Sequence, residues 1–354
     1  MRPIFFATDR KIDFDALAKA KSGGILIGSE DYFLNRFDPM LRYGYVEVSA
    51  PPRRSVADQN YESNSRSQNT SKHFALWNAF LANSTAELKE WTAKKYQQPA
   101  PTILYVHGID NSFHDAAERL AQMEIDYRWE GPPLLFSWPS DTFRWFKTVP
   151  GLPLTPENYR KIQRVGLASE LYLVQTIRDL LSPGPYHIEA HSMGSLLTAD
   201  AIHFIADSEG LSAPAQGILP TKPVVRTVSP SLSTNLLLVA PDIATREFMK
   251  MREAILTKVR HITIYCSDDS ILGLSRRVNG NERLGSCPKE RTPAEAVSGI
   301  DFVRVTGCTS STWDSHSVHL SVPEVIADIS KTLADAQELG LPPPGRDREI
   351  RCTR

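Results

Sequence analysis

Length, composition and charge are those of a globular protein. The sequence has 354 residues, 41% of them apolar and 23% charged, which is enough to bury one large core. Its 40 Lys and Arg balance 41 Asp and Glu, so the basic excess typical of a nucleic-acid binder is missing. No apolar stretch is long enough to span a bilayer, and the N-terminal apolar run is shorter than that of a signal peptide. These features predict a cytoplasmic protein with no nucleic-acid partner and no integral membrane segment.

Strand and helix patterns alternate along the chain. Eight short apolar runs predict strands, at 4–7, 44–48, 102–106, 134–137, 187–190, 236–239, 262–266 and 302–305. Helical patterns occur at 76–95, 112–128, 157–181, 195–207, 245–257 and 324–339. Such alternation is typical of an α/β fold, here a mostly parallel eight-stranded sheet with helices on both faces, formed by one domain at 1–340.

Three segments depart from the alternation. Residues 53–71 are polar and predict a loop, and the proline-rich tail at 341–354 predicts disorder. Residues 141–165 connect a strand to a long helix and predict a small cap over the site, with Phe143, Trp145 and Phe146 as a substrate wall. In the alternative interpretation these aromatic side chains only pack the connection against the sheet.

The four cysteines are widely spaced and include no C-x-x-C pair, so they predict neither a zinc site nor a redox motif. Cys266 lies in an apolar strand, where a free buried thiol is common. In an exported protein, Cys287 and Cys308 would be able to pair.

The most informative motif is Ala190-His191-Ser192-Met193-Gly194, which joins an apolar strand to a helical pattern. A small-x-Ser-x-small sequence in this context is the signature of a nucleophile elbow, in which Ser192 occupies a sharp turn. The flanking residues must be small because the backbones approach closely there. By itself the pattern arises by chance in roughly one chain in four of this length, so its context carries the prediction.

A serine nucleophile needs an orienting acid and a histidine base, which follow it along the chain in this order on α/β-hydrolase folds. For the acid we favour Asp269, after the strand at 262–266, over Asp268 beside it and over Asp242, which would also fit as a cap for the helix near residue 245. For the base we favour His316 over His319, whose apolar neighbours are typical of a packed core histidine.

An oxyanion hole is predicted after the strand at 102–106. A glycine turn, His107-Gly108-Ile109, leads there into a helix. One backbone N–H would come from Ile109 and the other from Met193, directly after the nucleophile.

Several motifs together resemble a bacterial α/β-hydrolase family long filed as a domain of unknown function. The resemblance extends from about Phe5 to Leu333 and is most specific in Phe136-Ser137-Trp138-Pro139-Ser140 and in the elbow. The further matching motifs are Phe6-Ala7-Thr8-Asp9-Arg10, Arg42-Tyr43-Gly44, Tyr105-Val106-His107-Gly108, Asn111-Ser112-Phe113, Ala240-Pro241-Asp242 and Leu274-Ser275-Arg276-Arg277.

The resemblance implies a single α/β-hydrolase domain with a triad of Ser192, Asp269 and His316. The chain departs from the family in two places: the Ser267-Asp268-Asp269 loop is one residue shorter than usual, and Val318 replaces an aromatic residue.

The predicted function is hydrolysis of a carboxylic ester through an acyl-enzyme intermediate, without metal or organic cofactor. The substrate would be a small-molecule or lipid-like ester. A lipase or acyltransferase would use the same triad, and a peptidase is possible on the same fold. A non-catalytic binding protein with this fold is the alternative from a different class.

Overall fold

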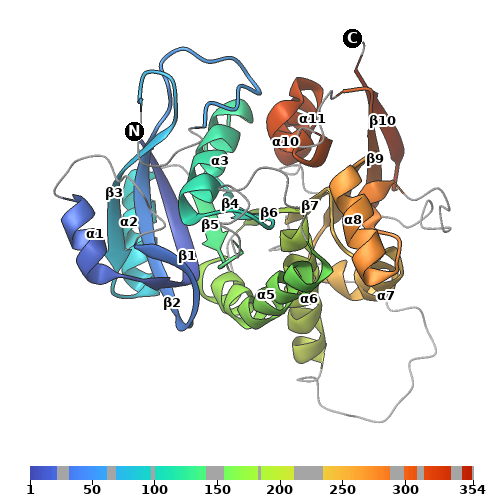
Figure 1. The fold of residues 1–354 in the computed structure, drawn as a ribbon, viewed down its shortest axis with the longest axis horizontal. Coiled ribbons are helices and arrows are strands. Elements are labelled where there is room, and N and C mark those ends of the chain that lie inside the picture. Colours follow the sequence, from blue (N-terminus) through green and yellow to red (C-terminus); the bar gives the residue numbers. More distant parts are fainter. Residues whose placement is uncertain are drawn as a thin grey trace.

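Ten strands form one sheet in the computed structural model, which describes residues 1–21, 32–61, 69–96, 100–140, 155–181, 185–210, 234–287, 299–308, 315–335 and 345–352 (Figure 1). The strands are β1 Arg2–Ile12, β2 Phe33–Ser49, β3 Ala75–Ala82, β4 Thr102–Val106, β5 Pro133–Ser137, β6 Tyr186–His191, β7 Asn235–Val239, β8 His261–Ser267, β9 Ile300–Thr306 and β10 Asp347–Arg351. Their order is β10-β9-β8-β7-β6-β4-β5-β1-β2-β3, and only the β1–β2 and β2–β3 pairs of this described sheet are antiparallel.

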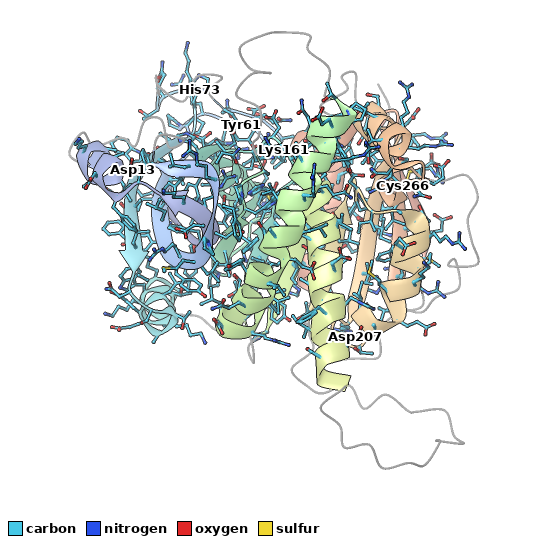
Figure 2. All side chains as sticks on the ribbon, turned by 60° about the horizontal axis from the view of Figure 1, so that its bottom comes forward. Asp13, Tyr61, His73, Lys161, Asp207 and Cys266 are labelled. Carbon is cyan, nitrogen blue, oxygen red and sulfur yellow. A yellow bond between two sulfur atoms is a disulfide. The ribbon has the colours of Figure 1, made fainter. Side chains whose placement is uncertain are left out.

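Helices cover both faces of the sheet, as predicted. They are α1 Phe14–Lys21, α2 Thr85–Lys95, α3 Phe113–Asp126, α5 Pro156–Thr176 with the π-helical turn η2 Ile177–Leu181, α6 Met193–Gly210, α7 Thr245–Ile255, α8 Ser270–Asn279, the 3₁₀ turn η3 Leu284–Ser286, α10 Val318–Ser321 and α11 Pro323–Asp335. One core lies between the sheet and α1, α3, α10 and α11, and a second lies under α2, α5, α6 and α7. Figure 2 shows α5 and α6, which carry the labelled Lys161 and Asp207, side by side on the second face.

The central strands are continuously apolar because both of their faces are covered. Leu236, Leu237, Leu238 and Val239 of β7 are all fully buried, which is the pattern of parallel strands inside an α/β fold. Parallel strands bring their carboxyl ends to one edge of the sheet. The residues that follow β4, β6, β7, β8 and β9 therefore converge at that edge.

All eight predicted strands lie within observed strands, and β3 and β10 are additional. The predicted helix at 76–95 is wrong in its first half, because Ala75–Ala82 pairs with β2, for example Ala79 with Val46. The helix itself begins at Thr85, where the Ser84 hydroxyl accepts a hydrogen bond from the Glu87 N–H. Long-range strand pairing has overridden the helix-forming tendency of the Ala- and Leu-rich segment.

The prediction of a disordered tail is wrong for residues 345–352, where β10 pairs with β9 in parallel. The alternating charges that suggested disorder are paired: Arg346 and Arg348 form ion pairs with the buried Asp301, and Arg348 also binds Asp328. Buried Asp301 also accepts a hydrogen bond from the Arg346 N–H at 2.8 Å. Residues 341–344 lie outside the described residues.

The expectations for the cysteines are corrected. Cys266 is not a free thiol but forms a disulfide with Cys287, and Cys308 is bonded to Cys352 rather than to Cys287. The Cα atoms of the two pairs are 5.1 and 4.7 Å apart, within the range that a disulfide requires. Pairing follows distance in the fold, which sequence spacing does not reveal.

Two further predicted segments are only partly described. Of the polar loop at 53–71, the described part includes Arg54, whose guanidinium forms a buried ion pair with Asp126 at 2.6 Å. The proposed cap at 141–165 is described only from Thr155, which caps the N-terminus of α5 by accepting a hydrogen bond from the Asn158 N–H. Among the described helices, none combines the length and apolar character needed to cross a bilayer.

The Cys308–Cys352 disulfide provides a test of how β10 is held. Replacing both cysteines with alanine should lower the free energy of unfolding by about 2 to 4 kcal/mol, because the bond closes a loop with a sequence separation of 44. Urea unfolding without reductant measures the difference in free energy of unfolding between wild type and variant. Reductant added to both proteins should make this difference smaller. Equal unfolding midpoints without reductant would contradict this assignment.

Candidate active site

Ser192 lies at the apex of a sharp turn between β6 and α6. Its φ of 55° is in the left-handed region, which a residue with a side chain rarely adopts. A hydrogen bond from the Ser192 N–H to the Val239 carbonyl, at 2.9 Å, fixes the turn to β7. A Cβ at Gly194 would lie 2.5 Å from the carbonyl oxygens of Val106 and His107. Only glycine allows α6 to leave the turn this close to β4.

The structure brings Ser192, His316 and Asp269 together. The Ser192 Oγ lies 3.0 Å from Nε2 of His316, and the opposite ring nitrogen, Nδ1, hydrogen-bonds the Asp269 carboxylate. Residues 192, 269 and 316 are all at least 95% buried. A carboxylate on Nδ1 holds the tautomer in which Nε2 is free to accept the serine proton.

Asp269 divides its two carboxylate oxygens between two partners. Oδ1 accepts a hydrogen bond from the Ile271 N–H at 2.8 Å and so caps the N-terminus of α8, while Oδ2 faces His316. The cap fixes the side chain relative to its own helix. The carboxylate therefore reaches the histidine in a geometry set by α8.

Two further hydrogen bonds hold the segment that carries His316. The Ser267 hydroxyl, at the end of β8, donates to the Ser315 carbonyl at 2.7 Å. His191, directly before Ser192, has its Nε2 2.9 Å from the His316 carbonyl oxygen and so donates to it. The residue next to Ser192 thus restrains the backbone of His316.

The alternative acids have other surroundings. Asp268 is exposed, whereas Asp242 is buried and bound to Arg283, Tyr159 and Ser275. Asp242 does not cap α7 either, because the cap position is Ala244 and receives no side-chain hydrogen bond. Position in the sequence favours Asp269 over Asp242, although each follows one of two neighbouring parallel strands.

His319, the alternative base, packs in the core. It is 1% exposed, and its ring lies 4.7 Å from that of His191 and 6.2 Å from that of Tyr105, measured between ring centres. Burial, together with the charge of Arg119, lowers the pKa of His319 well below its usual value, and burial does the same for His191. Both imidazoles are therefore neutral near pH 7.

Sequence reasoning missed a buried carboxyl group that is linked to His319 through the Tyr127 hydroxyl, which lies 3.3 Å from the His319 carbonyl oxygen. Glu189, on β6, accepts a hydrogen bond from the Tyr127 hydroxyl at 3.0 Å. Burial raises the pKa of Glu189 to about 8, so the group is mostly protonated at neutral pH. A glutamate inside the apolar segment 187–190 was the sequence signal for it.

The loop after β4 packs directly against Ser192. A Cβ on Gly108 would lie 2.8 Å from that of Ser192, so this glycine permits the contact. The Trp138 indole donates to the His107 carbonyl at 2.8 Å, and the Asn111 amide donates to the Ile109 carbonyl at 2.7 Å. These bonds fix the loop that contains the Ile109 N–H.

Arg10 holds the same loop from β1, a contact that no local sequence pattern predicts. Its fully buried guanidinium donates to the Asn111 carbonyl at 2.7 Å and to the Ser137 hydroxyl at 2.9 Å. Burial and the charge of Arg10 lower the pKa of the nearby His107 to about 3, which keeps this ring neutral. The motifs around Arg10, His107 and Ser137 therefore meet at one place.

The remaining predicted site residues are placed as follows. Met193 is buried and is the first residue of α6, so its N–H has no acceptor within the helix. Ile109 is half-buried beside Gly108. Phe143, Trp145 and Phe146 lie outside the described residues. In the described part of the chain, no group of three His, Cys, Asp or Glu residues is arranged to hold a metal ion.

Comparison with solved structures gives distant similarity to esterases. A structure from the structural analysis of two fungal esterases from Rhizomucor miehei matches at 13% identity and a TM-score of 0.35, over 68% of this chain and 76% of that one. An esterase/lipase from an uncultured bacterium matches at 12% identity and a TM-score of 0.32, over 68% of this chain and 78% of that one. No curated protein matches the sequence.

The family comparison covers most of the chain. Residues 84–334 match the family described as alpha/beta hydrolase of unknown function (DUF900). That range includes β4 to β9, the Ser192 turn, Asp269 and His316. The chain is therefore a member of this alpha/beta hydrolase family.

Proposed function

We propose that the protein is a serine-dependent hydrolase that cleaves carboxylic esters through an acyl-enzyme intermediate. The observation that carries the proposal is the hydrogen-bonded series Ser192 Oγ, His316 Nε2 and Nδ1, and Asp269, built on a strained strand-to-helix turn. An unassisted serine hydroxyl is a poor nucleophile, and a neighbouring imidazole that is itself oriented by a carboxylate overcomes this.

The reaction follows from the geometry. Ser192 attacks the ester carbonyl while Nε2 of His316 accepts the hydroxyl proton, and Asp269 stabilises the imidazolium that forms. The N–H groups of Met193 and Ile109 stabilise the tetrahedral oxyanion. His316 then protonates the departing alcohol, and a water molecule activated by the same imidazole hydrolyses the acyl-enzyme.

A lipase or acyltransferase would use the same residues and would differ in acyl-chain length or in the acceptor. The aromatic wall of Phe143, Trp145 and Phe146 remains a prediction for the acyl pocket. The substrate we propose is a small-molecule or lipid-like ester, bound within the single domain at 1–340.

Ser192→Ala should lower kcat for p-nitrophenyl acetate by about 10⁶-fold, because it removes the nucleophile. A fluorophosphonate probe should label the wild type at Ser192, and should label neither this variant nor heat-denatured wild type. Full activity in Ser192→Ala, or an unlabelled wild type, would exclude the serine mechanism and favour a binding protein. Esters of increasing chain length, with and without added alcohol, separate esterase, lipase and acyltransferase.

Asp269→Asn and Asp242→Asn distinguish the two buried acids. Asp269→Asn should lower kcat by about 10⁴-fold, because the imidazole loses the carboxylate that sets its tautomer. Asp242→Asn should instead lower the free energy of unfolding, by about 3 kcal/mol, because Arg283 loses its buried counter-charge. Its kcat should stay at least about 100-fold above that of Asp269→Asn. The reverse order of kcat values would assign the acid to Asp242.

The compartment is a separate question, for which the sequence predicted the cytoplasm. The two disulfides favour an oxidising compartment, because cytoplasmic thiols are generally kept reduced. Alkylation of free thiols during lysis of the native host, followed by mass spectrometry, should find all four cysteines unmodified. Complete alkylation of Cys308 and Cys352 would support the cytoplasm.

A further inference from the structure

A short segment, residues 282–287, is hydrogen-bonded to the chain that follows β7. We call it the brace. The Leu284 N–H donates to the Ile243 carbonyl and the Gly285 N–H to the Pro241 carbonyl, both at 2.9 Å. A Cβ on Gly285 would lie 2.4 Å from the Ala240 carbonyl carbon. Glycine is therefore required for the brace to lie this close to residues 240–241.

Arg283 anchors the brace through a buried ion pair. Its Nε lies 2.7 Å from the Asp242 carboxylate, its Nη2 donates to the Asp242 backbone carbonyl, and both side chains are 4% exposed. Tyr159 of α5 and Ser275 of α8 donate to the same carboxylate. A buried pair of this kind adds little net stability over an apolar packing but imposes a definite geometry.

The same aspartate is connected to the nucleophile. The Asp242 backbone N–H donates to the Ser192 carbonyl at 3.1 Å, so the residue that accepts Arg283 also supports the strained turn. A displacement of the chain after β7 would therefore be transmitted to Ser192.

The brace is also connected to the acid, by two routes. Ser275, bound to Asp242 at 2.5 Å, lies on α8, whose N-terminal cap is Asp269. The disulfide from Cys287, at the end of the brace, to Cys266 closes a covalent ring that contains Asp269 and all of α8. Cys266 is labelled in Figure 2, beyond α6 on the side opposite Asp13.

We propose that Arg283 is a positioning residue, which locks α8 against Asp242 and so holds the Asp269 carboxylate at the distance that His316 requires. Ser192 and Asp269 follow different strands, and Asp242 connects them: its N–H binds the Ser192 carbonyl and its carboxylate binds α8 through Ser275. The expected loss of kcat rests on the proposed function, whereas the expected effect on the position of the Asp269 carboxylate rests on the geometry alone.

The test is the double variant Asp242→Asn/Arg283→Met, which removes both charges and avoids an unpaired buried ion that could unfold the protein. We expect kcat to fall about 100-fold, the cost of a misplacement of about 1 Å, with KM changed less than about 3-fold. In an Asp269→Asn background the same double change should lower kcat less than about 3-fold further, because a residue that acts through Asp269 has no effect once the acid is absent.

The control is Cys308→Ala/Cys352→Ala, which removes a stabilising disulfide outside the brace and outside the covalent ring that contains Asp269. It should lower stability but leave kcat unchanged. If the double variant and this control lose kcat equally, or if the loss is as large in the Asp269→Asn background as in wild type, the positioning role is overturned.

A readout that needs no substrate separates this inference from the proposed function. The proton between His316 Nδ1 and Asp269 should give a far-downfield proton NMR signal, because it lies in a buried hydrogen bond to a carboxylate. We expect the signal in wild type and in the cysteine control, and its loss or shift in the double variant. An unchanged signal in the double variant overturns the inference. A wild type that shows the signal but resists the fluorophosphonate probe overturns only the ester hydrolase.

Discussion

The left-handed serine between β6 and α6 is the constraint on which the rest of the structure depends. Ser192 takes this conformation only because the turn is bonded on several sides, to Val239 and to Asp242. The close approach of α6 to β4 demands glycine at position 194, and the approach of the next loop demands it at 108. An unfavourable backbone conformation persists only where several surrounding contacts hold it in place. The buried hydrogen-bond networks around the turn provide those contacts.

These networks are of two chemical kinds. Arg10 and the Asp242–Arg283 pair are charged groups whose hydrogen bonds are directed at backbone carbonyls and fix loops. His191, His319 and Glu189 are instead kept neutral by burial. The neutral His191 ring, 4.8 Å from that of His316 between ring centres, adds no charge that would compete with Asp269 for the His316 imidazole. Arg10 and Arg283, in contrast, use their charge to position the backbone.

Much of this arrangement could be predicted from local sequence. The turn was found from small residues around Ser192, and Asp269 and His316 from their order after successive strands, because chain order and strand ends are local properties. Arg10 and Arg283 could not be found in this way: each acts on a loop about 40 or more residues away. The same applies to β3 and β10, whose pairing and disulfide are long-range, and to the cysteines, whose partners depend on distance in the fold.

The dual role of Asp269 has a consequence for how this chain can vary. One oxygen of its carboxylate caps the N-terminus of α8 and the other binds the His316 imidazole. A single rotamer of this short side chain must therefore satisfy both contacts. A glutamate would carry the same charge but, one methylene longer, would be unable to keep both contacts at once. A substitution that shifts α8, even at its far end, would therefore also shift the carboxylate that contacts His316. Through the cap at its first turn, α8 is part of the candidate active site.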